Sequence, residues 1–215
     1  MDIYSSKAID AYVSELASRN PVPGGGGTCA LVGALGIALA EMVGNLTVGK
    51  EKYEAVRADM EKLIEKAAKL RKEMLDLIDK DPLVFEPLSK AYGLPRTTPE
   101  EAARKDAVME ECLYEAARVP LAIMDLCAES IEVIQEAAEK GAVLAVSDAG
   151  VAVLLCKAAM EGAALNVLVN TRYMKNREYA SGLNADAARF VAHYQDMADG
   201  IYDKVYGKLL RQAGK

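Results

Sequence analysis

A run of four glycines followed by a hydroxyl residue is the first feature that suggests chemistry: Gly24, Gly25, Gly26, Gly27 and Thr28. Consecutive glycines are entropically costly, but they allow backbone shapes and close approaches that side chains would block. Free N–H groups at a helix start also attract carboxylates and phosphates. The run is not a P-loop, because the Lys-Ser/Thr pair is missing, and no strand precedes it as in a dinucleotide-binding motif. We predict that these residues contribute to substrate binding; the alternative is a flexible turn.

Ionisable side chains near predicted helix ends form a second group of candidates. Lys50 and Tyr53 are three residues apart at a helix start, so they share one face. A lysine is electrostatically unfavourable there, which suggests a ligand-facing role for Lys50; a solvated surface lysine is the commoner alternative. Asp81 and Asp148 stand at other predicted helix starts, where a carboxylate either caps the helix or stabilises a cation and accepts protons.

A late apolar stretch contains polar residues at helical spacing. Ser147 precedes Asp148, and the stripe that begins at Asp148 also carries Asn166 and Asn170. Amide side chains on an apolar stripe are unfavourable unless they are paired. The two asparagines therefore bond to each other or to a neighbouring helix, or they face a ligand.

Metal and nucleophile chemistry have little support in the sequence. The single histidine, His193, lies in a late amphipathic segment without a nucleophile motif. Four cysteines have no CxxC spacing and sit among apolar residues: Cys29, Cys112, Cys127 and Cys156. We predict that they are buried free thiols in a reducing compartment and that the protein holds no metal.

The elements that must position these candidates read as helices. We expect helices over 5–19, 28–46, 50–79, 98–138 with a kink or break at Pro120, 147–171 and 183–212, and a short helix capped by Asp81 that ends near Tyr92. Thr28 is expected to cap the second helix, and no segment reads convincingly as a strand. The sequence therefore predicts an all-α protein, a single-domain bundle of six to eight helices over residues 1–215.

Composition limits the classes of partner. Hydrophobic residues make up 52% and charged residues 27%, which excludes intrinsic disorder. The net charge of −6 argues against binding nucleic acid or an anionic membrane over a broad face. No segment reaches about 18–20 uninterrupted apolar residues, and the N-terminus lacks the layout of a signal peptide. We expect a cytoplasmic protein.

Several ordered motifs resemble those of the cyclodeaminase/cyclohydrolase family, which includes the C-terminal domain of formiminotransferase-cyclodeaminase and stand-alone methenyltetrahydrofolate cyclohydrolases. The segment 21–27, with Ala34-Leu35-Gly36, resembles the signature PTPGGGS…GALGAALA. The similarity continues at 42–53, at 81–85, at 91–95, at 119–121, at 147–150 and at 162–167. One departure is that the acidic residue expected shortly after Asn170 is absent from 171–175.

The resemblance implies a homodimer or higher homo-oligomer, built from all-α chains, that acts on folates without a metal or redox cofactor. It implies either hydrolysis of 5,10-methenyltetrahydrofolate to 10-formyltetrahydrofolate or cyclisation of 5-formiminotetrahydrofolate with release of ammonia. The length of the chain favours the cyclohydrolase, since the deaminase is often fused to its transferase; a separate formiminotransferase would remove that argument. Our catalytic candidates are Asp81, Lys50 and Asp148.

Substrate-binding candidates are the residues named above that surround these groups: Gly24, Gly25, Gly26, Gly27, Thr28, Tyr53, Ser147, Asn166 and Asn170. The rival class is a non-catalytic helical oligomer that binds folate or only other protein chains. A structural protein would not need four glycines beside a helix end, which favours the enzyme.

Overall fold

Helices account for almost all of the chain in the computed structural model, which describes residues 3–213. No strand occurs within those residues, so the predicted all-α class is confirmed. The six α-helices are α1 (Ile9–Leu16), α2 (Gly25–Thr47), α3 (Arg57–Tyr92), α4 (Pro99–Lys140), α5 (Val146–Arg172) and α6 (Arg177–Ala213). Three short 3-10 helices lie between them: η1 (Tyr4–Ser6), η2 (Glu51–Val56) and η3 (Val143–Ala145).

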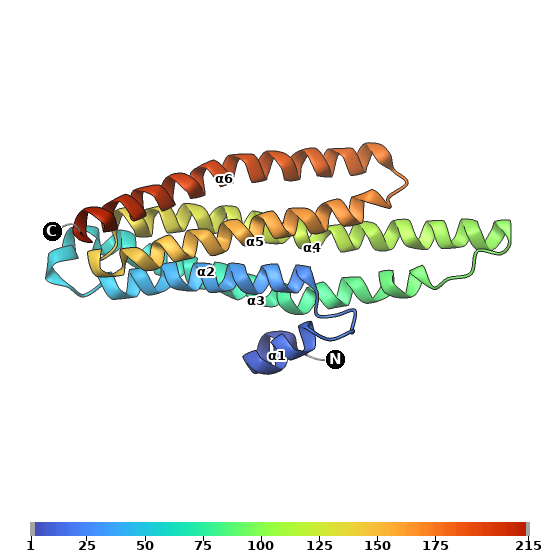
Figure 1. Cartoon of the computed structure of the whole chain (residues 1–215), viewed down its shortest axis with the longest axis horizontal. Helices are drawn as coiled ribbons and strands as arrows, with labels where there is room; N and C mark the ends of the chain where they lie inside the picture. The colour runs from blue at the N-terminus through green and yellow to red at the C-terminus, as the bar shows by residue number, and fades with distance from the viewer. Residues whose placement is uncertain (1–2, 214–215) are drawn as a thin grey trace.

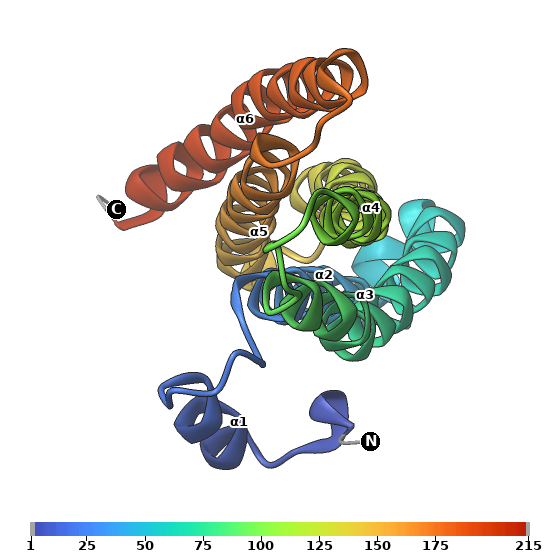
Figure 2. The ribbon, with the colours of Figure 1, turned by 90° about the vertical axis from the view of Figure 1, so that its right-hand side faces the viewer.

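The five long helices lie lengthwise in one elongated bundle, and α1 projects from its side (Figure 1). The central helix, α2, packs against α3, α4 and α5, and α6 covers α5 and part of α4. Figure 2, which looks along the bundle, shows α1 and α6 at opposite edges of this arrangement. Successive long helices run in opposite directions. Residues near the end of one helix therefore lie beside residues near the start of the next.

Small residues bring α2 and α5 close together, as the apolar, glycine-containing sequence of α2 predicts. A Cβ atom at Gly36 would lie 2.6 Å from the Sγ atom of Cys156 and 3.0 Å from the carbonyl oxygen of Ala152. Such distances are too short for a side chain, so glycine is required at this crossing. Cys127 and Cys156 are buried, Cys29 and Cys112 are half-buried, and all four are free thiols.

The helix break predicted before Asp81 is wrong. Helix α3 runs without interruption through Pro82 and Pro87, so Asp81 lies inside this helix and is not its N-cap. A proline inside a helix removes one backbone hydrogen bond and costs about 3 kcal/mol. Ile78 and Leu88 are fully buried on either side of the prolines, and this packing offsets the cost. The continuous helix fixes Asp81 in the middle of the protein rather than at a loop.

Several predicted boundaries also differ from the structure. Helix α2 begins at Gly25 inside the glycine run, and the Thr28 hydroxyl donates to the carbonyl oxygen of Gly24 over 2.8 Å, so Thr28 is not the cap. Helix α4 starts with the expected capping box at Thr98 but continues unbroken past Pro120. Helix α6 begins at Arg177, earlier than predicted, because the turn after α5 is short.

Two helical stretches, 25–47 and 143–172, are long and apolar enough to cross a membrane if a few charged residues are allowed. Within the most apolar windows, 44% and 50% of the residues are buried inside the bundle. Central bundle helices are apolar around most of their circumference for the same reason as membrane spans. In this fold both stretches form the centre of the bundle.

Candidate active site

Asp81 and the glycine run meet at one end of α2. The backbone N–H of Gly27 donates to Oδ2 of Asp81 over 2.9 Å. A Cβ atom at Gly26 would lie 2.0 Å from Oδ1 of Asp81, so only glycine lets the carboxylate approach the backbone here. The run therefore forms a close contact between the start of α2 and a carboxylate of the protein itself.

The environment of Asp81 changes its acidity. Burial raises the pKa of the Asp81 carboxyl above its ordinary value, and the hydrogen bond from Gly27 opposes this shift only in part. A carboxylate with a raised pKa is a better proton acceptor near neutral pH and attracts a cation strongly because little water screens it. Asp81 is thus equipped to stabilise positive charge and to accept a proton.

A cavity of about 240 Å³ opens beside this carboxylate. Its walls come from α2, α3, α4, α5 and the segment before α2, and they are mostly apolar. The lining residues are Pro21, Val22, Gly24, Gly25, Gly26, Asp81, Val84, Phe85, Ala116, Pro120, Asn166, Val169 and Asn170. An apolar pocket with a few convergent polar groups is the usual form of a small-molecule site.

Both predicted asparagines of α5 line this cavity, and each uses its amide nitrogen for a structural bond. Nδ2 of Asn166 donates to the carbonyl oxygen of Gly162, and Nδ2 of Asn170 donates across to the carbonyl oxygen of Ala116. The second bond compensates Pro120, which has no N–H to offer to the carbonyl four residues earlier. Among residues 3–213 no donor reaches the two amide oxygens, which leaves them available to a ligand.

Replacing Asn170 with Ala should lower the free energy of unfolding by about 1–3 kcal/mol, because a buried carbonyl loses its donor. In a Pro120→Ala background the same replacement should cost less, since the restored N–H of residue 120 supplies that donor. Urea denaturation of the four proteins in this double-mutant cycle measures the difference. Equal losses in the two backgrounds would contradict the compensation.

Tyr12 of α1 is a site neighbour that the sequence did not reveal. Its side chain is 4% exposed, and its hydroxyl has no hydrogen-bond partner within the described residues. The hydroxyl oxygen lies 3.6 Å from the position of a Cβ atom at Gly27, and burial raises its pKa. Burial also raises the pKa of the nearby Cys29 thiol to about 11, so this thiol stays protonated at neutral pH. The sequence of α1 does not reveal this contact, because too few residues of the helix reach the glycine run to produce a periodic pattern.

Tyr12→Phe should leave the free energy of unfolding unchanged or raise it by up to about 1 kcal/mol, because an unpaired buried hydroxyl is costly. Thermal unfolding of the two proteins provides the measurement. Tyr202→Phe, on the half-buried flank of α6, controls for the loss of a tyrosine hydroxyl in general. A destabilisation of more than about 1 kcal/mol in Tyr12→Phe alone would show that the hydroxyl is hydrogen-bonded after all.

The remaining predicted site residues lie at or beyond the other end of α2. Lys50 is exposed just after α2, and the Tyr53 hydroxyl accepts a hydrogen bond of 3.0 Å from the backbone N–H of Val143. Ser147 is exposed and Asp148 half-buried in the first turn of α5. Within residues 3–213, Lys50 has no ion pair.

The length of α2 separates the two groups. With 23 residues and about 1.5 Å of rise per residue, α2 spans roughly 33 Å between the glycine run and the segment that holds Lys50. Figure 1 shows the start of α2 near the middle of the bundle and its end beside the start of α5. The fold thus joins the glycine run, Asp81 and the asparagines, and it does not join them to Lys50 or Asp148 in one chain.

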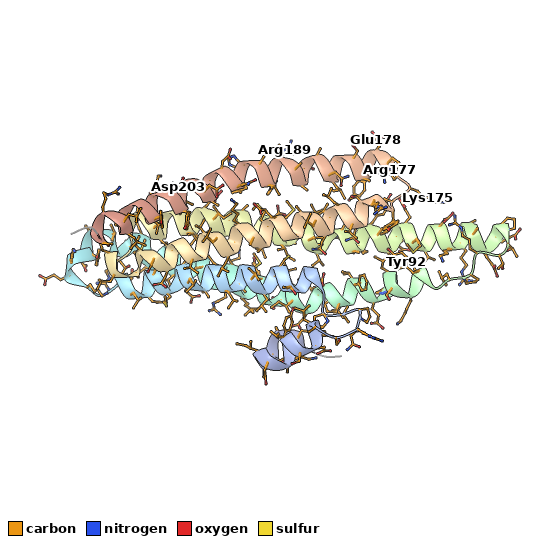
Figure 3. All side chains as sticks on the ribbon, viewed as in Figure 1. Tyr92, Lys175, Arg177, Glu178, Arg189 and Asp203 are labelled. Atoms are coloured by element: carbon orange, nitrogen blue, oxygen red, sulfur yellow. The ribbon has the colours of Figure 1, made fainter. Side chains whose placement is uncertain are left out.

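The turn between α5 and α6 is held on the same side of the bundle as the cavity. Figure 3 places Lys175 and Arg177 at this turn and Tyr92 on α3 below it. The backbone N–H groups of Lys175 and Asn176 both donate to the Glu110 carboxylate, at 2.6 and 2.9 Å. A carboxylate from α4 therefore anchors the segment in which the expected acidic residue is missing.

No group of three or more His, Cys, Asp or Glu side chains within the described residues is arranged to hold a metal ion. His193 is exposed on α6, where its ring stacks edge-on against Tyr194. The polar side chains that line the cavity are one carboxylate, of Asp81, and two amides, of Asn166 and Asn170.

Comparison with known proteins identifies the family of the chain. The sequence model of the formiminotransferase-cyclodeaminase family matches residues 8–189. The chain belongs to that family. A methenyltetrahydrofolate cyclohydrolase of Methylorubrum extorquens is 40% identical over 204 residues, which cover 95% of this chain and 98% of the relative. The family resemblance suggested by the glycine run and by the later motifs is confirmed.

Other members of the formiminotransferase-cyclodeaminase family are also similar. The formimidoyltransferase-cyclodeaminase of Sus scrofa is 36% identical over 199 residues, but this chain covers only 37% of its length. The crystal structure of formiminotetrahydrofolate cyclodeaminase from Thermotoga maritima matches with a TM-score of 0.79 at 28% identity, over 97% of this chain and 98% of that one. The family fold therefore extends over nearly the whole chain.

Proposed function

We propose that the protein is a methenyltetrahydrofolate cyclohydrolase, which hydrolyses 5,10-methenyltetrahydrofolate to 10-formyltetrahydrofolate. The observation that carries the proposal is the half-buried Asp81 carboxylate on the wall of an apolar cavity, held by the glycine turn. The near full-length similarity to a cyclohydrolase supports the choice of substrate.

The substrate is a cation, and its charge is shared by N5, N10 and the carbon between them. Asp81 stabilises this cation and accepts a proton from the water that attacks the carbon. The carbon–N5 bond of the tetrahedral intermediate then breaks, N5 takes up a proton and the oxygen becomes the formyl carbonyl. One proton is released overall, and no oxidant, metal or other cofactor is consumed.

The rest of the cavity binds and orients the substrate in this proposal. The amide oxygens of Asn166 and Asn170 accept hydrogen bonds from the N–H groups of the pterin ring, and Phe85 and Pro120 contact its faces. The glycine turn, with Thr28 at its end, lets the ring approach the backbone closely. Lys50, Tyr53, Ser147 and Asp148 remain proposed site residues, although within one chain they lie near the far end of α2.

The alternative activity is formimidoyltetrahydrofolate cyclodeaminase, which the similarity to the Thermotoga maritima enzyme favours. In that reaction N10 attacks the formimino carbon and ammonia leaves after protonation. The same carboxylate serves both reactions, since each passes through a tetrahedral carbon between N5 and N10.

Two parallel assays distinguish the activities. Purified protein is mixed with 5,10-methenyltetrahydrofolate or with 5-formiminotetrahydrofolate, and the methenyl absorbance is followed. Enzyme-dependent loss of absorbance identifies the cyclohydrolase, and a gain with release of ammonia identifies the cyclodeaminase. A folded protein that does neither would favour the rival class, a non-catalytic helical oligomer.

The raised pKa of Asp81 gives a pH dependence. The reaction needs the carboxylate, so kcat/KM should fall as the pH drops through the Asp81 pKa, at a higher pH than for an ordinary aspartate. Initial rates in buffers of constant ionic strength provide the profile, corrected for the uncatalysed hydrolysis. An acidic limb in the usual aspartate range would contradict the role given to Asp81.

We also propose that the protein is cytoplasmic and acts as a homo-oligomer on a free folate. We propose that it binds neither nucleic acid nor a membrane. If the activity is the deaminase, a separate formiminotransferase supplies its substrate.

A further inference from the structure

The hydroxyl of Tyr12 is the only buried side-chain oxygen or nitrogen atom within residues 3–213 that has no hydrogen-bond partner. Tyr12 is also the one buried residue of α1, the short helix that stands off from the bundle in Figure 2. Burying a hydroxyl without a partner is unfavourable. Its place beside the active site therefore calls for a partner that the free protein does not supply.

Three oxygen atoms converge on the space that the missing side chain of Gly27 leaves open. Measured from the position of a Cβ atom at Gly27, the carbonyl oxygen of Ile78 lies at 3.5 Å, the Tyr12 hydroxyl at 3.6 Å and Oδ2 of Asp81 at 3.7 Å. The backbone N–H of Gly27 also donates to Oδ2. A small movement of Tyr12 therefore brings its O–H group to the carboxylate or to the carbonyl oxygen.

Of these two acceptors, the carboxylate is the stronger. Helix α3 continues through Pro82, which has no N–H to offer to the carbonyl oxygen of Ile78 four residues earlier. That oxygen and Oδ2 of Asp81 can both accept, and Tyr12 has a single hydroxyl proton to give. A hydrogen bond to a carboxylate is roughly twice as strong as one to a neutral carbonyl. When Asp81 is ionised, its Oδ2 atom is therefore the preferred partner of Tyr12.

The two oxygen atoms of the Asp81 carboxylate have different surroundings. Oδ2 faces Gly27 and Tyr12, whereas Oδ1 lies 2.0 Å from the position of a Cβ atom at Gly26. Asp81 and Gly26 line the cavity, and Tyr12 does not. A hydrogen bond from Tyr12 to Oδ2 thus leaves Oδ1 free on the side of the cavity.

We propose that Tyr12 is a positioning residue for Asp81: when substrate fills the cavity, its hydroxyl donates to Oδ2 and holds Oδ1 toward the attacking water. The inference rests on the proposed function and adds the residue that orients its carboxylate. Hydrogen bonds of catalytic groups are often long without substrate and tighten in its complex. Substrate also displaces water from the cavity, and a hydrogen bond to a charged group is stronger where water is excluded.

Few other groups set the acidity of Asp81. Only burial and the N–H of Gly27 shift its pKa, so no charged side chain within residues 3–213 contributes. The titratable neighbours are Tyr12 on α1 and Cys29 on α2, and the charge of Asp81 helps to raise the pKa of both. The pKa of Cys29 is about 11, and the two amides of α5 do not titrate. An acidic limb in the pH profile therefore reports Asp81.

The pH dependence of kcat in Tyr12→Phe tests the inference, with whichever folate the natural protein turns over. The profile of kcat/KM reports the free enzyme and that of kcat reports the substrate complex. A donor to a carboxylate lowers its pKa, so losing the donor should move the acidic limb of kcat to higher pH by about one to two units. The acidic limb of kcat/KM should stay in place. At neutral pH, kcat should fall by about 10–100-fold, because the carboxylate is no longer held in position.

Gly27→Ala interrupts the same contact without removing the hydroxyl. The added methyl group would meet the three oxygen atoms at 3.5 to 3.7 Å, which is ordinary van der Waals contact. Alanine is favoured over glycine inside a helix, so the Tm should be unchanged or higher. Because the methyl group occupies the space between Tyr12 and Oδ2, the acidic limb of kcat should move as in Tyr12→Phe. The double variant should shift no further than either single one, and shifts that add would contradict a shared bond.

Tyr4→Phe is the control for the packing of α1. The ring of Tyr4 packs edge-on against that of Tyr12, with the centroids 6.4 Å apart, and its hydroxyl donates to Glu15 over 3.5 Å. This variant should keep the natural kcat and both acidic limbs. Equal shifts in Tyr4→Phe and Tyr12→Phe would attribute the effect to loosened packing and overturn the inference.

The activity of the natural protein separates the inference from the proposed function. If the natural protein turns over a folate and Tyr12→Phe keeps the natural kcat profile, Tyr12 has no positioning role and the proposed function stands. If the natural protein turns over neither folate, the proposed function fails and the inference fails with it.

Discussion

Asp81→Asn is expected to lower kcat/KM for 5,10-methenyltetrahydrofolate by about 10²–10⁴-fold, the usual contribution of a general base. The amide has the shape of the carboxylate and can still accept the hydrogen bond from Gly27. It cannot accept the proton of the attacking water or balance the charge of the substrate cation. Initial rates, measured after subtraction of the uncatalysed reaction, give the ratio.

The same variant should be at least as stable as the natural protein at neutral pH. Because burial raises the Asp81 pKa, the folded state binds this proton more readily than the unfolded chain does. Its contribution to stability is therefore greatest below the unfolded pKa and declines as the pH rises through the folded pKa. An uncharged asparagine removes this decline, so thermal unfolding at pH 7 should show an equal or higher Tm.

Asp76→Asn is the matched control for Asp81. Asp76 lies on the same helix, is exposed and stands outside the cavity. Its replacement should leave kcat/KM within about twofold, since a surface charge change alters little. Equal losses in the two variants would mean that the net charge of the protein, rather than the position of Asp81, governs the rate.

Gly26→Ala is expected to combine a loss of activity with a loss of stability. The added Cβ atom would lie 2.0 Å from Oδ1 of Asp81 and 2.6 Å from its Cγ atom. Either the carboxylate or the start of α2 must move, and forcing an extra carbon into a packed site costs about 1–3 kcal/mol. We expect a drop in kcat/KM of at least about 100-fold, because a displacement of about 1 Å removes that much catalysis.

Gly200→Ala separates this clash from the general effect of a methyl group in a helix. Nothing lies within 4 Å of a Cβ atom at Gly200, which is exposed on α6. That variant should keep full activity and gain about 0.5–1 kcal/mol in the free energy of unfolding. Rates and urea denaturation of both variants check the pair. Full activity in Gly26→Ala would show that the carboxylate does not need its present position.

The sequence predicted the all-α class and most of the helices because these depend on local patterns. The continuous apolar run of α2 and the capping box at Thr98 are local signals, and both lead to helices in the structure. The predicted break before Asp81 failed for the opposite reason. A proline is a strong local signal, but the packing of Ile78 and Leu88 on both sides is a tertiary effect that no local pattern records.

The candidate site divides in the same way. By itself, the sequence determined which residues are unusual: four glycines before a buried helix, an aspartate beside a proline, and two asparagines on an apolar stripe. Only the tertiary structure decided which of them meet. Asp81 is 54 residues from Gly27, yet the two are joined by a hydrogen bond, because α2 and α3 run antiparallel. Lys50 is closer to Gly27 in sequence, but the rigid length of α2 holds it at the far end.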